Sequence, residues 1–133
     1  MRADIIQDCG NSLNENIDIG QIEGGFIQGL GWLTCEELCF SQEGKLLTTG
    51  PSTYKLPGSR DVPPIFNVKL LENADNDEKT IFRSKAVGEP PLLLAISHFL
   101  ALKEAIKASL PSSKAELLNS PATPSEILKA IYA

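Results

Sequence analysis

The longest helical pattern in the sequence lies in its first third. Apolar residues recur there at three- and four-residue spacing, at Ile19, Ile22, Phe26, Leu30 and Leu33. This spacing predicts an amphipathic helix from about residue 19 to 38. Asp18 stands just before the pattern, with Gln21 three residues on, so we expect the Asp18 carboxylate to cap the first turn.

A second helical pattern covers residues 92–109. Its apolar face carries Leu92, Ile96, Phe99, Leu100 and Ile106. Pro90 and Pro91 precede it, and proline suits the first helical positions because its missing N–H would have no intrahelical partner there. A last short helix is predicted to follow residues 121–125 and to end near Tyr132.

Shorter patterns predict strands and loops between these helices. Residues 3–8 and 65–71 read as strands, 40–47 as a hairpin that turns at Glu43-Gly44, and 80–82 as a further short strand. Residues 50–64 are rich in Pro, Gly and Ser, which predicts an irregular loop, and residues 73–79 predict a solvated one. The expected fold is α+β: one domain with two main helices packed on a small mixed sheet.

Glycine is unusually frequent in the first predicted helix, at Gly20, Gly24, Gly25, Gly29 and Gly31. Each costs about 1 kcal/mol relative to alanine in a helix interior. A helix tolerates such a cost where another backbone or a ligand must come close. The pattern therefore predicts close approach of another element or of a flat ligand, and not a nucleotide loop, because the spacing of the known phosphate-binding motifs is absent.

Composition narrows the function classes. The chain has 133 residues, with 12 Lys+Arg against 17 Asp+Glu and a net charge of -5, so we expect neither a nucleic-acid nor an anionic-membrane partner. No apolar run approaches the roughly 18 residues of a transmembrane helix. Three cysteines are too few for a disulfide scaffold and favour a reducing, cytoplasmic setting. A strand predicted almost at Met1 suggests a fragment of a longer protein.

Glu89 is the most suggestive candidate for chemistry. It stands between Gly88 and Pro90 at a predicted helix start, where the positive end of the helix dipole favours the ionised carboxylate that a general base requires. An acid that only satisfies helix-terminal N–H groups fits the same position. Gln21 could likewise either offer its amide to a ligand or simply face solvent.

Other polar residues give weaker signals. Cys35 and Cys39 are four apart and would share a helix face, but two thiols do not complete a metal site, so no metal ligand is expected from this chain. His98 is expected to lie on a helix face without a catalytic role.

Three segments together, residues 18–31, 50–57 and 84–92, resemble the C-terminal molybdopterin-binding region of xanthine dehydrogenases and the related aldehyde oxidases. The resemblance runs from about residue 2 to 131. Ser52-Thr53 and residues 120–124 favour the xanthine dehydrogenases within this family. The resemblance as a whole implies that residues 1–133 are the C-terminal part of a molybdenum-cofactor-binding domain.

The resemblance also implies roles for individual residues. Glu89 would be the catalytic base that deprotonates a hydroxyl on molybdenum, in the oxidation of hypoxanthine or xanthine to urate with water as the oxygen source. Gln21 would contact the molybdopterin. Four further residues would run beside the cofactor: Lys85, Ala86, Val87 and Gly88.

The same resemblance implies partners that complete the enzyme. The [2Fe–2S] clusters and FAD would be bound by the remainder of the polypeptide or by complementary subunits, and the complete enzyme would be a homodimer. The isolated chain is then expected to be inactive. Two alternatives remain open: a truncated fragment that acts at most as a cofactor-binding or interaction module, and an aldehyde oxidase-type hydroxylase.

Overall fold

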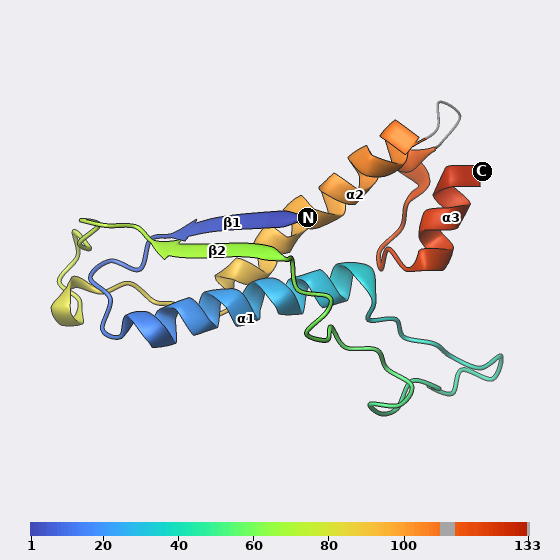
Figure 1. The fold of residues 1–133 in the computed structure, drawn as a ribbon. Coiled ribbons are helices and arrows are strands. Elements are labelled where there is room, and N and C mark those ends of the chain that lie inside the picture. Colours follow the sequence, from blue (N-terminus) through green and yellow to red (C-terminus); the bar gives the residue numbers. More distant parts are fainter. Residues whose placement is uncertain (110–113, 133) are drawn as a thin grey trace.

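The computed structural model describes residues 1–109 and 114–132 and confirms the α+β class (Figure 1). The elements follow in the order β1 (Arg2–Gln7), α1 (Glu15–Thr34), β2 (Ile65–Leu70), η1 (Ile81–Arg83), η2 (Pro90–Ala95), α2 (Ile96–Ser109), η3 (Ala115–Leu117) and α3 (Pro124–Tyr132), where η denotes a 3₁₀ helix. Within these ranges no helix is long and apolar enough to cross a membrane.

The sheet consists of two parallel strands in the described part of the chain, where a mixed sheet was expected. Arg2 of β1 lies opposite Ile65 of β2, and Gln7 lies opposite Leu70. Side chains alternate in exposure along both strands, and Ile5 is the most buried of them. The sheet therefore has one face toward the core and one toward solvent.

The prediction of a strand near residues 80–82 is wrong, because this segment forms the 3₁₀ turn η1. Phe82 and Arg83 have positive φ values of 51° and 58° there. Such a left-handed conformation is incompatible with an extended strand. The hairpin predicted for 40–47 is present as a single antiparallel bridge between Phe40 and Leu46.

The first helix begins earlier and ends earlier than the predicted range of 19–38. Asn14 caps it, since its side-chain oxygen accepts a hydrogen bond from the Ile17 amide at 3.2 Å. Asp18, the predicted cap, lies inside the first turn and accepts a bond from the Ser12 hydroxyl at 2.5 Å. The α-helix ends at Thr34, where Cys35 leaves helical geometry. The second predicted helix starts as η2 and continues as α2 to Ser109.

Two apolar clusters form the core. The larger joins the sheet, α1 and η2 through Ile5, Cys9, Ile22, Phe26, Leu30 and Ala95. The smaller joins α2, η3 and α3 through Ile106, Ala115, Leu118, Ala122 and Ala130. The Ala122 amide donates to the Leu33 carbonyl at 2.7 Å, so the C-terminal segment is also tied to the end of α1. Figure 1 shows α3 beside the far end of α2.

In the larger cluster, the backbone of α1 lies close to η2 and to the residue pair before it. A Cβ at Gly29 would lie 2.8 Å from the Ala95 Cβ and nearer still to the Leu92 carbonyl oxygen. A Cβ at Gly25 would lie 3.5 Å from the Gly88 carbonyl oxygen. The predicted close approach is thus an approach of backbone to backbone at these two positions.

The glycines of α1 differ in their surroundings, which provides a matched test. We expect Gly29→Ala to lower the free energy of unfolding by about 1–3 kcal/mol, because the methyl group overpacks the contact with η2. Gly24→Ala should raise it by about 0.5–1 kcal/mol, because alanine favours a helix and its Cβ would meet no described atom within 4 Å. Urea unfolding followed by circular dichroism measures both.

Equal effects of the two substitutions would contradict this account, since they share the same change in side chain and the same helix. A destabilising Gly24→Ala would mean that helix propensity is not the dominant effect on the open side of α1.

Candidate functional site

Three of the predicted cofactor residues line one cavity of about 610 Å³. Its lining residues are Leu13, Asp18, Lys79, Thr80, Ile81, Ser84, Lys85, Ala86 and Val87. They come from the start of α1 and the turn before it, and from residues 79–87, which include part of η1. Two separate parts of the chain therefore form this cavity.

The other predicted residues lie outside this lining. Gln21 is exposed on α1, three residues after Asp18. Gly88 packs its carbonyl toward Gly25 of α1, and a Cβ added at Gly88 would meet no atom of the described chain within 4 Å. The open side of Gly88 is therefore accessible to a ligand.

Glu89 is exposed and directly precedes η2. Its side chain makes no capping hydrogen bond to η2, while its carbonyl accepts the Leu92 amide at 2.8 Å. The alternative role, in which the Glu89 carboxylate only accepts from helix-terminal N–H groups, is therefore not seen among the described residues. The carboxylate is left available for chemistry.

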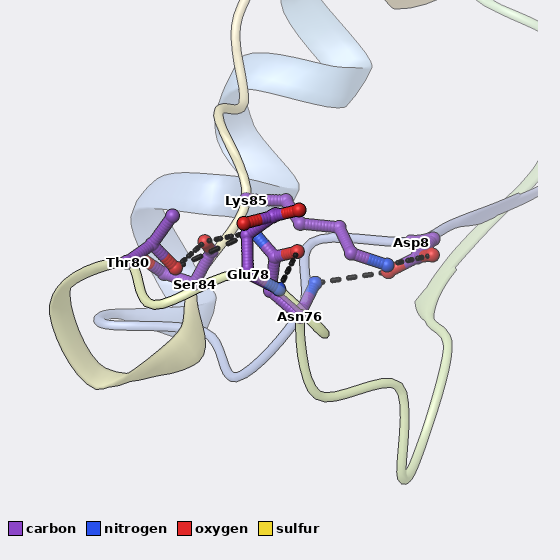
Figure 2. Close-up of polar contacts among 7 residues, drawn as sticks. Asp8, Asn76, Glu78, Thr80, Ser84 and Lys85 are labelled. Carbon is purple, nitrogen blue, oxygen red and sulfur yellow. Dashed lines mark hydrogen bonds and ion pairs between the residues drawn. The ribbon is translucent and has the colours of Figure 1, made fainter.

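An ion pair fixes the start of the predicted segment. Lys85 Nζ lies 2.5 Å from Asp8 Oδ2, and the two side chains are 34% and 41% exposed (Figure 2). The hydrogen bond from Lys85, with a second from the Gly10 amide, holds the pKa of Asp8 below its ordinary value of 3.8. Lys85 is thus tied to the residue that follows β1.

The backbone around Gly10 reinforces this connection. The Lys85 amide donates to the Cys9 carbonyl at 2.9 Å, and the Asn11 amide donates to the Arg83 carbonyl at 3.1 Å. Gly10 has φ +61°, and a Cβ there would lie 2.9 Å from the Lys85 nitrogen and closer to the Arg83 carbonyl oxygen. Only glycine satisfies both the conformation and the space.

A further set of polar residues around η1 was missed by sequence reasoning, which assigned residues 73–79 to a solvated loop. The Ser84 carbonyl accepts hydrogen bonds from the Thr80 hydroxyl at 2.6 Å and from Asn76 Nδ2 at 3.2 Å. Figure 2 shows these side chains beside the Asp8–Lys85 pair. Left-handed conformations at non-glycine residues, as at Phe82 and Arg83, cost about 1–3 kcal/mol each and persist where surrounding contacts hold them.

The sulfur and imidazole groups lie elsewhere. Cys35 is the C-cap of α1 and Cys39 lies beyond the helix, so they do not share a helix face as predicted. His98 is half-buried on α2, and burial lowers its pKa. Cys35 and His98 contribute to a different cavity of about 420 Å³. No group of three or more His, Cys, Asp or Glu side chains that could hold a metal ion occurs among residues 1–109 and 114–132.

The lining of the 610 Å³ cavity combines polar and apolar groups. It carries two lysines, two hydroxyl side chains and one carboxylate, beside apolar groups such as Ile81 and Val87. Within the described chain Lys85 pairs with Asp8, and the Thr80 and Ser84 hydroxyls donate to the Ser84 and Ile81 carbonyls. The apolar groups of the lining can contact a flat ring.

The Asp8–Lys85 pair gives a pH-dependent prediction. The lowered pKa means that folded Asp8 binds fewer protons than unfolded Asp8. Its stabilising contribution is therefore present above the unfolded pKa of 3.8 and is lost as the pH falls from there through the lower pKa of the folded state. We expect Asp8→Asn to lower the midpoint of urea unfolding at pH 7 and to change it much less at pH 3.

The control is the same substitution in a Lys85→Met background, where most of this pH dependence should disappear. An Asp8→Asn effect of equal size at both pH values would contradict the assigned ion pair.

Known proteins resemble this chain along almost all of it. The family Molybdopterin cofactor-binding domain matches residues 1–63. Xanthine dehydrogenase/oxidase of Felis catus is 54% identical over 136 residues, which cover 98% of this chain and 10% of the relative. Xanthine dehydrogenase 2 of Arabidopsis thaliana is 50% identical over 143 residues, with the same two shares. The chain thus spans only a tenth of the length of these relatives.

Solved structures share the fold. Quinoline 2-oxidoreductase from Pseudomonas putida 86 matches with a TM-score of 0.79 and 28% identity, over 96% of this chain and 15% of that one. The Cu,Mo-CO dehydrogenase matches with a TM-score of 0.73 over 94% of this chain and 15% of that one, and at 19% identity it supports the fold alone.

These findings confirm the resemblance that three sequence motifs predicted. The chain is therefore a homologue, along nearly its whole length, of one segment of the xanthine dehydrogenases, an oxidoreductase family, and its first part matches their molybdopterin cofactor-binding domain.

Proposed function

We propose that this chain forms the wall of a molybdenum-cofactor site that carries the catalytic base of a purine hydroxylase. Residues 1–133 would be the C-terminal part of the cofactor-binding domain. The observation that supports this most directly is the continuous segment from Lys85 to Glu89. Its first three residues line a cavity, and it ends in the exposed carboxylate of Glu89, which makes no capping hydrogen bond to η2.

In this proposal the wall contacts the molybdopterin through several kinds of group. Gln21 offers an amide that can both donate and accept hydrogen bonds. Lys85, Ala86 and Val87 line the cavity, and Gly88 leaves its backbone uncovered on one side. Each of these features is compatible with the flat, heteroatom-rich cofactor that the family match suggests.

Glu89 is the proposed catalytic base. The cofactor, when bound, supplies the redox chemistry that accepts two electrons from the substrate. The Glu89 carboxylate accepts a proton from the water-derived nucleophile, which makes that oxygen reactive toward an electron-poor ring carbon. Its place just before η2 suits this role, because Pro90 and Pro91 restrict the backbone on the far side.

The rest of the enzyme is proposed to lie in the remaining polypeptide or in complementary subunits. The exposed apolar side chains on η2 and α2 support this, for example Leu93 at 66% and Leu100 at 54% exposure. Such faces commonly mark interfaces. The [2Fe–2S] clusters and FAD would be held there and would carry the electrons away, in a cytoplasmic homodimer.

The proposed substrates are hypoxanthine and xanthine or a related N-heterocycle. The curated relatives quoted above are named for xanthine, which favours this class over the aldehydes of an aldehyde oxidase-type enzyme. The isolated chain would then be an inactive piece, because it holds one wall of the site.

Two preparations test this proposal. The 133-residue chain is purified alone, and it also replaces the aligned segment of the Felis catus relative to form a chimera. We expect molybdenum and xanthine turnover in the chimera and neither in the isolated chain. Turnover by the chain alone would refute the view that it forms only part of a site.

The base is tested by Glu89→Gln in the chimera. We expect kcat to fall by about 10²–10⁴-fold, because the amide cannot accept the proton, while molybdenum content stays unchanged. Glu104→Gln is the matched control, since Glu104 is an exposed glutamate of α2 outside the cavity lining. A Glu89→Gln enzyme that keeps its rate would exclude Glu89 as the base.

A further inference from the structure

The Lys85–Glu89 segment is not held at its C-terminal end by a capping hydrogen bond from the Glu89 side chain. The Glu89 carboxylate caps nothing within the described chain, and the exposed side chain is carried by its backbone. On the C-terminal side, Pro91 is fully buried and anchors the chain. On the N-terminal side, Lys85 is held by Asp8 and by the Cys9 carbonyl, and Val87 packs against the larger apolar cluster. The turn that precedes Lys85 is a further anchor, because it sets the direction in which the segment departs.

That turn includes the two left-handed positions Phe82 and Arg83. Phe82 is 74% exposed, so packing does not hold its conformation. Polar contacts must therefore do so. Some of them lie within the turn itself, and Asn76 provides four more from the neighbouring loop.

Asn76 contacts this turn through both its backbone and its side chain. Its amide donates to the Arg83 carbonyl at 3.0 Å, and its carbonyl accepts from Arg83 Nη1 at 3.1 Å. Its Nδ2 donates to the Ser84 carbonyl at 3.2 Å, while its Oδ1 accepts from the Glu78 amide at 3.2 Å (Figure 2). The side chain thus links its own loop to the residue just before Lys85.

The opposite side of the same turn is held by the segment after β1. The Asn11 amide donates to the Arg83 carbonyl, which therefore accepts from Asn11 and Asn76 together. The Lys85 amide donates to the Cys9 carbonyl at 2.9 Å. The turn is therefore held by hydrogen bonds from two segments: the residues after β1 on one side and Asn76 on the other.

We propose that Asn76 is a positioning residue for Glu89: it fixes the turn from which the Lys85–Glu89 segment departs, and with it the direction of the carboxylate. This rests on the proposed role of Glu89. Thr80 assists, because its hydroxyl donates to the same Ser84 carbonyl at 2.6 Å. Asn76 itself touches no substrate or cofactor in this proposal.

The first experiment measures amide hydrogen exchange in the 133-residue chain. Asn76→Ala and Asn76→Asp both remove the donor to Ser84, and Asp keeps the size of the side chain and an oxygen for the Glu78 amide. We expect the Asn11 and Lys85 amides to exchange at least about tenfold faster in both variants. Asp77→Ala, an exposed neighbour in the same loop, should leave both rates unchanged.

The second experiment measures turnover in the chimera, with kcat expressed per bound molybdenum. We expect Asn76→Ala to lower kcat by about tenfold or more with little change in KM, because a misdirected base impairs the chemical step more than binding. Thr80→Val should have the same kind of effect, whereas Thr80→Ser keeps the hydroxyl and should retain the rate.

The outcomes separate this inference from the proposed function. An unchanged kcat per molybdenum in both Asn76→Ala and Thr80→Val, in a chimera that Glu89→Gln inactivates, would overturn the positioning role alone. Unchanged amide exchange in the Asn76 variants would overturn it as well. A chimera in which Glu89→Gln keeps full turnover would instead refute the proposed base, whatever Asn76 does.

Discussion

The contact of α1 with η2 through Gly29 is the constraint on which the rest of the structure depends. Helices in contact are usually separated by their side chains, but here the Leu92 carbonyl and Ala95 lie where a Cβ of Gly29 would stand. The approach holds η2 against the helix that also covers the sheet, and Ala95 joins the same apolar cluster as Ile22 and Phe26. The absence of a side chain at Gly29 therefore determines where the Glu89 segment can lie.

That segment is accordingly supported from three directions. Helix α1 contacts it at Gly25, the segment after β1 supports it through Asp8 and Gly10, and the loop before η1 supports it through Asn76. Rigid support of this kind suits a catalytic carboxylate, because a base is effective only within hydrogen-bond reach of the proton it accepts. The exposed apolar side of η2 and α2 leaves room for the rest of a larger enzyme.

The sequence predicted the elements that depend on local periodicity, and it failed where distant residues decide the outcome. The apolar spacing of Ile22, Phe26 and Leu30 predicted α1, and the glycines predicted a close backbone approach. The boundary of α1 was misplaced because Asn14 and Asp18 are both good caps. In the structure Asn14 accepts from the Ile17 amide, whereas Asp18 accepts from Ser12. No local pattern could reveal that residues 80–84 form a left-handed turn held by Asn76, since the bonds join separate loops. The cofactor residues came from motif resemblance, and the cavity accounts for three of them.

The parallel sheet has a consequence for how the chain folds. Asp4 of β1 and Asn67 of β2 are hydrogen-bonded neighbours although 63 residues separate them. The ends of a long loop must therefore meet before these two strands can pair. The entropy lost in closing the loop raises the free-energy barrier to folding. Helix α1 lies inside that loop and can form early, so its buried face provides the surface on which the two strands are brought together.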